Sequence, residues 1–268
     1  MAWNKITFFG VAVALTSFFS PVVSTNIDSG SQPELSLCYL TRHATPPNEP
    51  QIRLPPTFST PPSSPSDWDV TPDYWFLGRW YYIASGNPAY QGWSNMQWDL
   101  TPISTEDTNE PSLQRQDLVS YSFEGEVYLI YGIDTPVAPD AYQWVAPGPL
   151  SVQNNTWQIM AWGYDSADVP YTMFFETWPT GQPSQFYFIS RSDKGIAEDT
   201  YQTLVDSVKK IGNQELNEAL TRVYQIKQDG GRHGETYAGC NATCKENAYA
   251  LPPQLLQAQQ GQQGQPPQ

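Results

Sequence analysis

The side chains best suited to chemistry in this sequence are one acid and two amides on a single short segment. Asn95, Gln97 and Asp99 alternate along a run of β-forming residues, and alternation places them on one face of a strand. If that face is turned toward an apolar cavity, burial raises the pKa of Asp99 and keeps its proton available for general acid catalysis. The simpler alternative is an ordinary strand-end carboxylate near solvent.

Two further acids are weaker candidates. Asp165 lies in the segment GYDSAD, where an aspartate normally stabilises the turn itself. Glu176 alternates with Met173 and Phe175 on a strand-like segment, and its side chain could face either way.

The cysteines and histidines are too few and too scattered for most metal or hydrolase chemistry. Cys38, Cys240 and Cys244 are the three cysteines, and His43 and His233 are far apart in sequence, so we expect no metal site and no Ser-His-Asp triad. A disulfide is the better interpretation. It joins either Cys240 to Cys244 or one of them to Cys38, and the sequence leaves the pairing open.

Composition excludes one class of partner. The formal net charge is −14, and a chain this acidic repels phosphate backbones, so we expect no nucleic-acid binding. Aromatic residues make up 14% of the chain, with 16 Tyr and 10 Trp among them. These residues favour strands and the walls of a ligand cavity.

The two ends of the sequence predict targeting and flexible segments. Lys5 precedes an apolar run over 7–19 that is too short to span a bilayer, and Ser24 fits a cleavage site, so we predict a signal peptide over 1–24. A Pro/Ser/Thr-rich linker is predicted over 25–74, and a disordered Gln/Pro-rich tail over 246–268. Glycosylation sequons are present at Asn154 and Asn241.

Between these segments, over 75–245, the sequence predicts a mainly β domain. Eight strand-like segments are separated by short turns, which indicates an antiparallel up-and-down barrel. They cover 79–85, 94–103, 118–123, 126–133, 141–145, 156–163, 171–178 and 185–190. An apolar stripe with helical spacing then runs from Leu204 to Val223, and Gly212-Asn213 could break this helix into two pieces.

Three residues at the ends of these strands indicate the barrel type. Gly78 and Trp80 form a Gly-x-Trp motif on the first strand, and Arg191 follows the eighth strand. An Arg stacked on a Trp at the closed end of a barrel is a cation–π contact. This pattern, followed by a helix, resembles the lipocalins.

The segment GRWYYIASGNPAYQGWSNMQ, residues 78–97, narrows the resemblance. It is similar to the opening of the violaxanthin de-epoxidase lipocalin domain, and Trp157, Tyr171 and the Ser-Arg-Ser around Arg191 follow in the family's order. The resemblance implies a barrel that binds a long xanthophyll, with an acid on the second strand that protonates the epoxide and ascorbate as the reductant. Asn95 stands where the family has that acid, so the expected catalytic group is replaced by a neutral amide.

On this basis we expect a barrel that binds a xanthophyll-like or other apolar small molecule, with no bound cofactor. The first alternative is an active de-epoxidase-like oxidoreductase that uses ascorbate as co-substrate, with Asn95, Gln97 and Asp99 at its site. The second is a secreted glycoprotein in which the barrel is only an interaction scaffold. The expected cavity lining is Tyr82, Asn95, Gln97, Asp99, Met160, Trp162, Tyr171, Met173 and Phe175.

Location and further contacts follow from the same features. The signal peptide predicts secretion, and the resemblance adds the thylakoid lumen of a complex plastid as an alternative address. A barrel that takes up an apolar ligand is also expected to make peripheral contact with a membrane.

Overall fold

The computed structural model describes residues 50–59, 68–103, 114–179 and 181–252. They belong to a compact unit that spans residues 40–268. The predicted signal peptide over 1–24, Cys38 and His43 lie outside the described residues.

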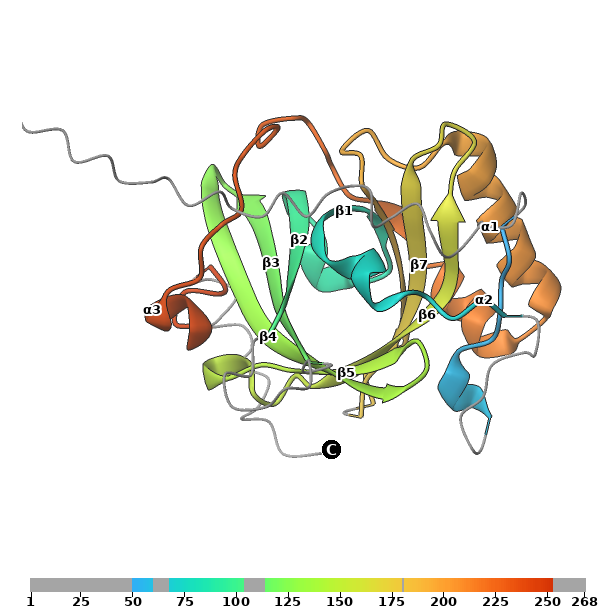
Figure 1. Ribbon diagram of the computed structural model, residues 1–268, viewed down its shortest axis with the longest axis horizontal. Helices are drawn as coiled ribbons and strands as arrows, with labels where there is room; N and C mark the ends of the chain where they lie inside the picture. The colour runs from blue at the N-terminus through green and yellow to red at the C-terminus, as the bar shows by residue number, and fades with distance from the viewer. Residues whose placement is uncertain (1–49, 60–67, 104–113, 180, 253–268) are drawn as a thin grey trace, which may run out of the picture. The chain divides into compact units, whose positions relative to one another are not determined.

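Eight antiparallel strands form a closed barrel (Figure 1). Each strand pairs with the next along the chain, and β1 pairs with both β8 and β2, which closes the ring. The strands are β1 Gly78–Ser85, β2 Ser94–Pro102, β3 Arg115–Phe123, β4 Glu126–Ala138, β5 Ala141–Val145, β6 Asn155–Tyr164, β7 Pro170–Thr177 and β8 Gln185–Ser190. The predicted up-and-down, lipocalin-like barrel is therefore confirmed.

Turn chemistry sets the register of the hairpins. Glu124 and Gly125 both adopt positive φ angles, as a two-residue hairpin turn of the favoured twist requires, and Phe123 then pairs with Glu126. Four register shifts interrupt the pairing of the described strands, and two of them bear on the predicted site. The register shifts between Ser94 and Gln97 on β2 and between Ile159 and Ala161 on β6, and such bulges change which face a side chain occupies.

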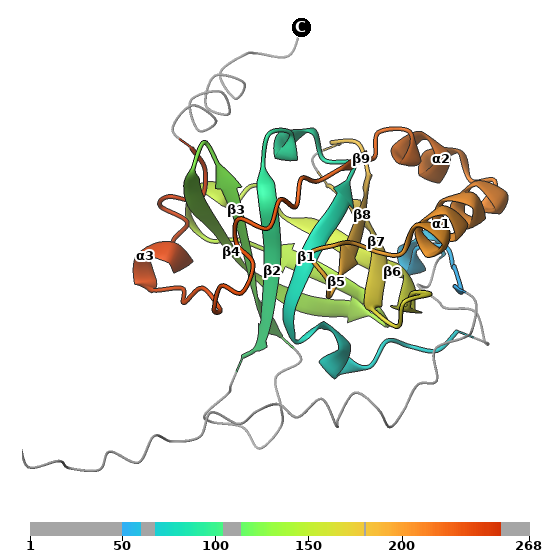
Figure 2. The ribbon, with the colours of Figure 1, turned by 90° about the horizontal axis from the view of Figure 1, so that it is seen from above.

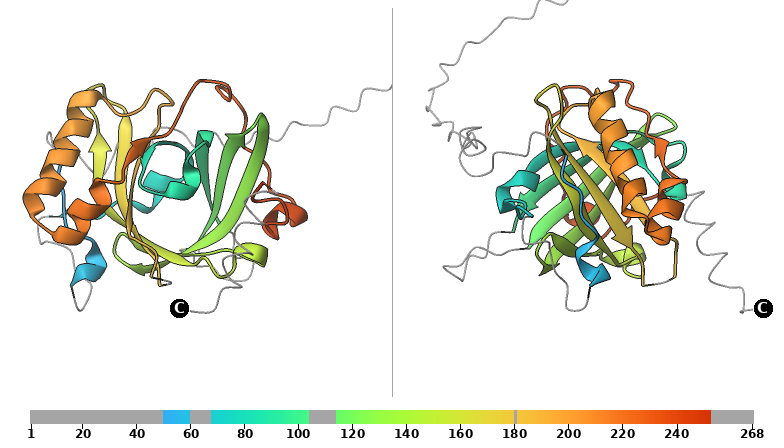
Figure 3. Two further views of the ribbon diagram at one scale, coloured as in Figure 1. Left: turned by 180° about the vertical axis from the view of Figure 1, so that it is seen from behind. Right: turned by 90° about the vertical axis from the view of Figure 1, so that its right-hand side faces the viewer.

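Two helices pack on the outside of the barrel, beside β6, β7 and β8 (Figures 1 and 3). They are α1 Glu198–Ile211 and α2 Gln214–Leu220. Gly212 ends α1 in the left-handed conformation and the Asn213 side chain accepts a hydrogen bond from the Leu216 amide to begin α2, so the predicted break is confirmed. The chain does not stay helical to residue 225, because β9 Tyr224–Gln225 pairs with the end of β1.

The apolar stripe of these helices explains why β7 and β8 are apolar on both faces. Leu204, Val208 and Leu216 are fully buried against Phe175 and Phe188 on the outer face of the barrel. A strand covered by a helix on one side and a core on the other has no polar face.

Parts of the predicted linker are packed rather than extended. Arg53 forms an ion pair with Asp140 at 3.2 Å with both side chains fully buried, and Trp68 donates a hydrogen bond to the same carboxylate. Phe58 packs edge-on against Phe175. The linker prediction is therefore wrong for residues 50–59 and 68–74, because their sparse apolar and charged side chains have dedicated partners on the barrel.

The start of the predicted tail is also ordered. A short helix, α3 Ala242–Lys245, is followed by a segment in which Asn247, Ala250 and Leu251 are buried against the barrel. No helix within the described part of the chain combines the length and apolar content that a membrane span requires.

Candidate functional site

The closed end of the barrel is built as the sequence predicted. The guanidinium of Arg191 lies 4.0 Å from the centre of the Trp80 ring and donates hydrogen bonds to the backbone oxygens of Trp75, Leu77 and Arg79. Burial lowers the pKa of Arg191 to about 10. Gly78 has a φ of 91° and a Cβ there would lie 3.3 Å from Arg191, so both the conformation and the close approach favour glycine.

The outer face of β2 carries the residues expected to act on a ligand. Asp99 makes a bidentate ion pair with Arg79, with contacts of 2.9 and 2.8 Å. Gln97 donates to the Arg232 carbonyl at 3.4 Å. Their neighbours on the strand, Met96 and Trp98, belong to the barrel core instead. The prediction that Gln97 and Asp99 line the cavity is therefore wrong, and neither is placed to act as a catalytic group there.

Asn95 has a structural role that explains its amide. Its Oδ1 accepts a hydrogen bond from the Asp229 amide at 3.0 Å, and its Nδ2 donates to the Asp229 carboxylate at 2.6 Å. An amide can do both at once, whereas a carboxylate would oppose the charge of Asp229. Its φ of 49° lies in the left-handed region, where Asn is better tolerated than most residues. Asn95 is thus not a cavity residue.

The remaining predicted cavity residues divide between the two faces of the wall. Tyr82 lines the cavity. Trp162 faces the interior but packs on Trp75 near the base, with ring centres 4.8 Å apart, and does not reach the cavity. The prediction is wrong for the remaining members, which lie outside the barrel under the helices: Met160, Tyr171, Met173 and Phe175.

A partly open cavity of about 90 Å³ lies at the opposite end of the barrel from Trp80. Loops β1–β2, β5–β6 and β7–β8 contribute Tyr90, Trp93, Leu150 and Trp178 to its walls. The strands contribute mainly aromatic side chains and two acids. The strand residues are Tyr82, Trp98, Asp117, Val119, Ile130, Trp144, Asn155, Trp157, Phe174, Glu176 and Tyr187.

The absence of a side chain at Gly132 sets the position of one cavity-lining ring, that of Trp144. A Cβ on Gly132 would lie 2.1 Å from the indole nitrogen of Trp144, so the missing side chain on β4 is what allows this ring to lie across the strand. Trp144 then occupies volume that would otherwise enlarge the cavity.

Three carboxyl groups gather on the inner side of the barrel. Asp117 and Glu176 line the cavity, and Asp134 interacts with both of them. Burial is the largest cause of the shift for each: it raises the pKa of Glu176 to about 8 and that of Asp134 to about 7, and it holds the pKa of Asp117 well above its usual range. Neutral, proton-bearing acids therefore face the cavity near neutral pH.

Hydrogen bonds hold two of these acids in place. The Tyr187 hydroxyl donates to Glu176 Oε2 at 2.5 Å, and the Trp157 indole donates to Asp134 Oδ1 at 2.8 Å. The positive charge of Arg115 partly offsets the rise in the pKa of Asp134. The Arg115 guanidinium also donates hydrogen bonds to Asp73 and Tyr142.

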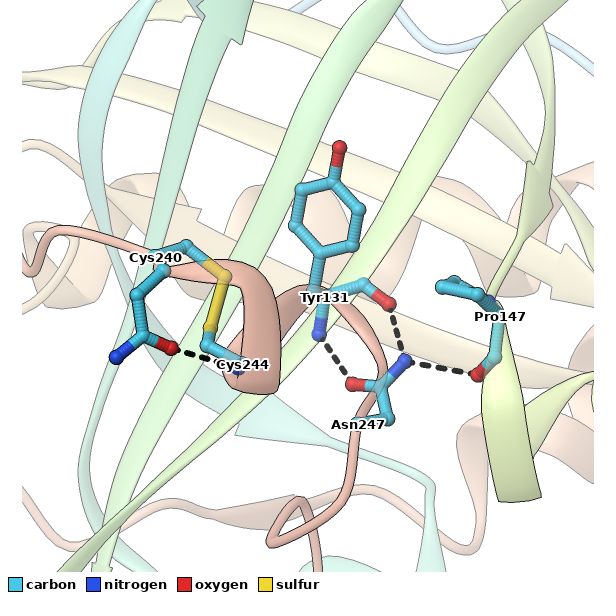
Figure 4. The surroundings of a disulfide bond; sticks show 6 residues. Tyr131, Pro147, Cys240, Cys244 and Asn247 are labelled. Atoms are coloured by element: carbon cyan, nitrogen blue, oxygen red, sulfur yellow. Dashed lines mark hydrogen bonds between the residues drawn. A yellow bond between two sulfur atoms is a disulfide. The ribbon is translucent and has the colours of Figure 1, made fainter.

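The C-terminal segment wraps around the outside of the barrel and ends at the cavity. After β9 it runs across β1 and β2 (Figure 2), and Leu251 reaches the cavity wall. Asn247 anchors it by bonding both backbone groups of Tyr131 at 2.8 Å and the carbonyl of Pro147 at 3.1 Å (Figure 4). Tyr121 donates to the Ala250 carbonyl at 2.9 Å.

A disulfide precedes this anchor. Cys240 is bonded to Cys244 (Figure 4), which resolves the pairing that the sequence left open. Asn241, the second sequon, caps α3 by accepting a hydrogen bond from the Cys244 amide at 2.9 Å. The first sequon, at Asn154, lies just before β6. Whether either carries a glycan stays a prediction.

Sequence reasoning missed Asp117 and Asp134 and gave Glu176 only a minor place. The signal was present: Asp117 and Asp134 interrupt the apolar face of their strands. Asp165 behaves as predicted for a turn residue, because its carboxylate accepts from the amides of Ala167, Val169 and Ala197. Among the described residues, no group of three Cys, His or acidic side chains could hold a metal ion.

No protein-family model and no curated protein matches this sequence. Solved structures with a similar arrangement are lipocalins. Insecticyanin from the tobacco hornworm Manduca sexta is 14% identical with a TM-score of 0.42, over 59% of this chain and 82% of that one. Apocrustacyanin C1 is 17% identical with a TM-score of 0.39, over 59% and 79%.

A third similar structure is the siderocalin Ex-FABP, which is 10% identical with a TM-score of 0.39, over 62% of this chain and 99% of that one. Likeness at this level concerns the architecture. The assignment of the site rests on the side chains of this chain alone.

Proposed function

We propose that this chain is a lipocalin-type binding protein that holds a small ligand with an apolar body in its barrel. The observation that carries the proposal is the partly open, aromatic-lined cavity with two buried carboxyl groups at the mouth side of the barrel. A cavity with mostly apolar walls and a few convergent polar groups is the usual form of a small-molecule site. The buried acids raise the cost of folding, and packing alone does not explain their retention.

Size limits the ligand. An engineered cavity of about 150 Å³ holds a benzene ring, and the cavity here is smaller, at about 90 Å³. A long xanthophyll would therefore require Tyr90 and Leu251 to move outward, and a compact ligand fits the closed form better. Aromatic rings fill most of the interior, which is also what a pure scaffold would show, but a scaffold has no use for Asp117 and Glu176.

The neutral acids favour one second function, a de-epoxidase-like oxidoreductase with ascorbate as reductant. Glu176 or Asp117, rather than Asp99, would supply the proton to the epoxide oxygen, because both line the cavity. Incubation with violaxanthin and ascorbate at mildly acid pH tests this directly. A product that forms at the same rate in Glu176→Gln and Asp117→Asn would remove both acids from such a mechanism.

We also propose an extracellular or luminal location, supported by the Cys240–Cys244 disulfide, since structural disulfides persist in oxidising compartments.

Val127 and Tyr249 are exposed and line one surface groove with Cys244. Apolar side chains in this position support peripheral membrane contact during ligand uptake.

Binding is tested by titrating the full chain with short alcohols, amines, aldehydes and fatty acids while tryptophan fluorescence is recorded. Trp93, Trp98 and Trp157 line the cavity, so an occupant changes their emission. Val119→Phe should fill the cavity and abolish the response, whereas Val127→Phe, at a half-exposed position on the hairpin, should leave it unchanged. A saturable response that survives Val119→Phe would contradict the proposed site.

A further inference from the structure

The acids of the cavity outnumber the cationic side chains beside them. Asp117 and Glu176 line the cavity from opposite parts of the barrel wall, and Asp134 lies next to Asp117. Their exposed fractions are 4%, 7% and 0%. Arg115 compensates only Asp134, and it is shared with Asp73 on the outside. Within the described residues, Asp117 and Glu176 therefore face the cavity with no cationic partner on the protein.

Two oxygens of this group are left without a hydrogen bond of ordinary geometry. They are Oδ1 of Asp117 and Oδ2 of Asp134, both buried and without such a partner among the described residues, although the Trp98 indole is close enough to Asp117 to oppose the rise of its pKa. Buried polar atoms in folded proteins are nearly always satisfied, so an orphaned carboxylate oxygen at a cavity wall points to a donor that comes from outside the protein. The indole nitrogen of Trp93, also at the cavity, is likewise without a partner among the described residues.

The other walls are π-electron faces. Tyr82 contacts Trp98 and Tyr187 with ring centres 6.0 and 5.8 Å apart, and Tyr90 stacks on Trp93 at 4.6 Å. Such faces attract a positive charge, more strongly when water is excluded. Carboxylates and π faces around one cavity together complement an organic cation and repel an anion.

A metal ion fits this space poorly. The described residues contain no group of three acidic, Cys or His side chains that could hold one, and hard cations need about six oxygen ligands. We propose, as a refinement of the function proposed above, that the cavity binds a small organic cation, an ammonium group on a short apolar body, with the ammonium between Asp117 and Glu176. The apolar body then lies against the aromatic walls.

Binding of this kind is linked to pH. The titratable and charged groups that face the two acids are Tyr82 on β1, Arg115 on β3, Asp134 on β4, Tyr187 on β8 and Tyr90 in the β1–β2 loop. The tyrosines stay neutral, because burial raises their pKa values. A cation must displace the proton from an acid, so its affinity rises with pH and protons are released on binding.

The test is calorimetric titration of the full chain with butylammonium, with butanol and butyrate as neutral and anionic probes of the same size. We expect butylammonium to bind at least about tenfold more tightly than butanol, to bind more tightly at pH 8 than at pH 5.5, and to release protons in buffers of different ionisation enthalpy. Butyrate should not bind.

Matched variants complete the test. Glu176→Gln and Asp117→Asn should each weaken butylammonium binding at least about tenfold while the near-ultraviolet circular dichroism stays unchanged, and Glu126→Gln, an exposed acid on β4, should have no effect. Equal or tighter binding of butanol would overturn the cation proposal but leave the binding function intact. No response to any of the probes used here or in the fluorescence titration would overturn both.

Discussion

The outer face of β2 and the cavity acids are two sets of polar side chains in one barrel that differ in how their charges are compensated. Outside, the Asp99 carboxylate is paired with Arg79, and the Asn95 amide is bonded to Asp229 through both its oxygen and its nitrogen. Inside, Glu176 accepts a hydrogen bond from Tyr187, but among the described residues no cationic group accompanies it or Asp117. The charge-paired set stabilises the fold, whereas the acids without a cationic partner cost stability and are free to bind a ligand.

Removing the strongest contact of the outer set gives the largest expected effect. Asp99→Ala leaves Arg79, whose side chain is 17% exposed, without its bidentate partner, and we expect the free energy of unfolding to fall by about 3 kcal/mol. Urea denaturation measures it. Asp206→Ala removes the exposed pair with Lys209 and should cost far less, because water screens an exposed ion pair. Similar losses in the two variants would show that the Arg79–Asp99 pair stabilises the fold no more than an exposed ion pair does.

Releasing the anchor of the C-terminal segment is expected to have the next largest effect. Asn247→Ala removes the three hydrogen bonds to Tyr131 and Pro147 and should destabilise the fold by about 2 kcal/mol. It should also speed ligand exit, measured by stopped-flow fluorescence, because Leu251 is no longer held at the cavity. Tyr249→Ala, at an exposed position in the same segment, is the control, and unchanged exit from Asn247→Ala would argue against a closed mouth.

The cavity acids give the protein a pH dependence of a defined sign. Glu176 titrates at an ordinary 4.5 when unfolded and near 8 when folded, so between these values the folded state holds the extra proton. The free energy of unfolding therefore falls as pH rises, by about 1.4 kcal/mol per pH unit for this group.

Urea denaturation at about pH 6 and about pH 7 checks this sign. The midpoint concentration of urea should be lower at the higher pH. Glu176→Gln should reduce the slope without abolishing it, because burial also raises the pKa values of Asp134 and Asp117, and Glu126→Gln should leave it unchanged. A wild-type midpoint that rises with pH would show that other groups dominate.

The smallest expected effect comes from restoring the acid that the resemblance led us to expect. Asn95→Asp places a carboxylate beside that of Asp229, whose pKa Lys227 and Asn95 hold below its usual range. We expect a loss of about 1 kcal/mol at pH 7 and no gain of activity. The loss should shrink at low pH, as these carboxylates become protonated, and a gain of de-epoxidase activity would show that this face does meet a substrate.

Local sequence features predicted the barrel and its base well. Gly78 acts through its backbone conformation, and Trp80 and Arg191 act through the contact between their side chains. The residue types at these strand ends therefore suffice to predict the closed end of the barrel. The break at Gly212-Asn213 was readable for the same reason. These features depend on neighbours a few residues away or on one specific contact.

The inner and outer faces could not be assigned from alternation alone. Period two separates two faces but does not say which is inside, and Met173 and Phe175 look like core because the helices cover them. Bulges at Asn95 and Met160 then shift the alternation. The docking of Arg53 and Asn247 depends on partners about a hundred residues away, which no local pattern reveals.

The contacts of the C-terminal segment also fix an order of events in folding. Asn247 is bonded to Tyr131, 116 residues earlier, and the segment binds Arg79, Asn95 and Tyr131 on strands that are all synthesised before it. Contacts this distant in sequence form after local hairpins, because closing the longer loop costs more entropy. We therefore expect the nascent barrel to pass through a stage in which the cavity lacks the part of its wall that Leu251 supplies, so that a ligand can enter before this segment has been made.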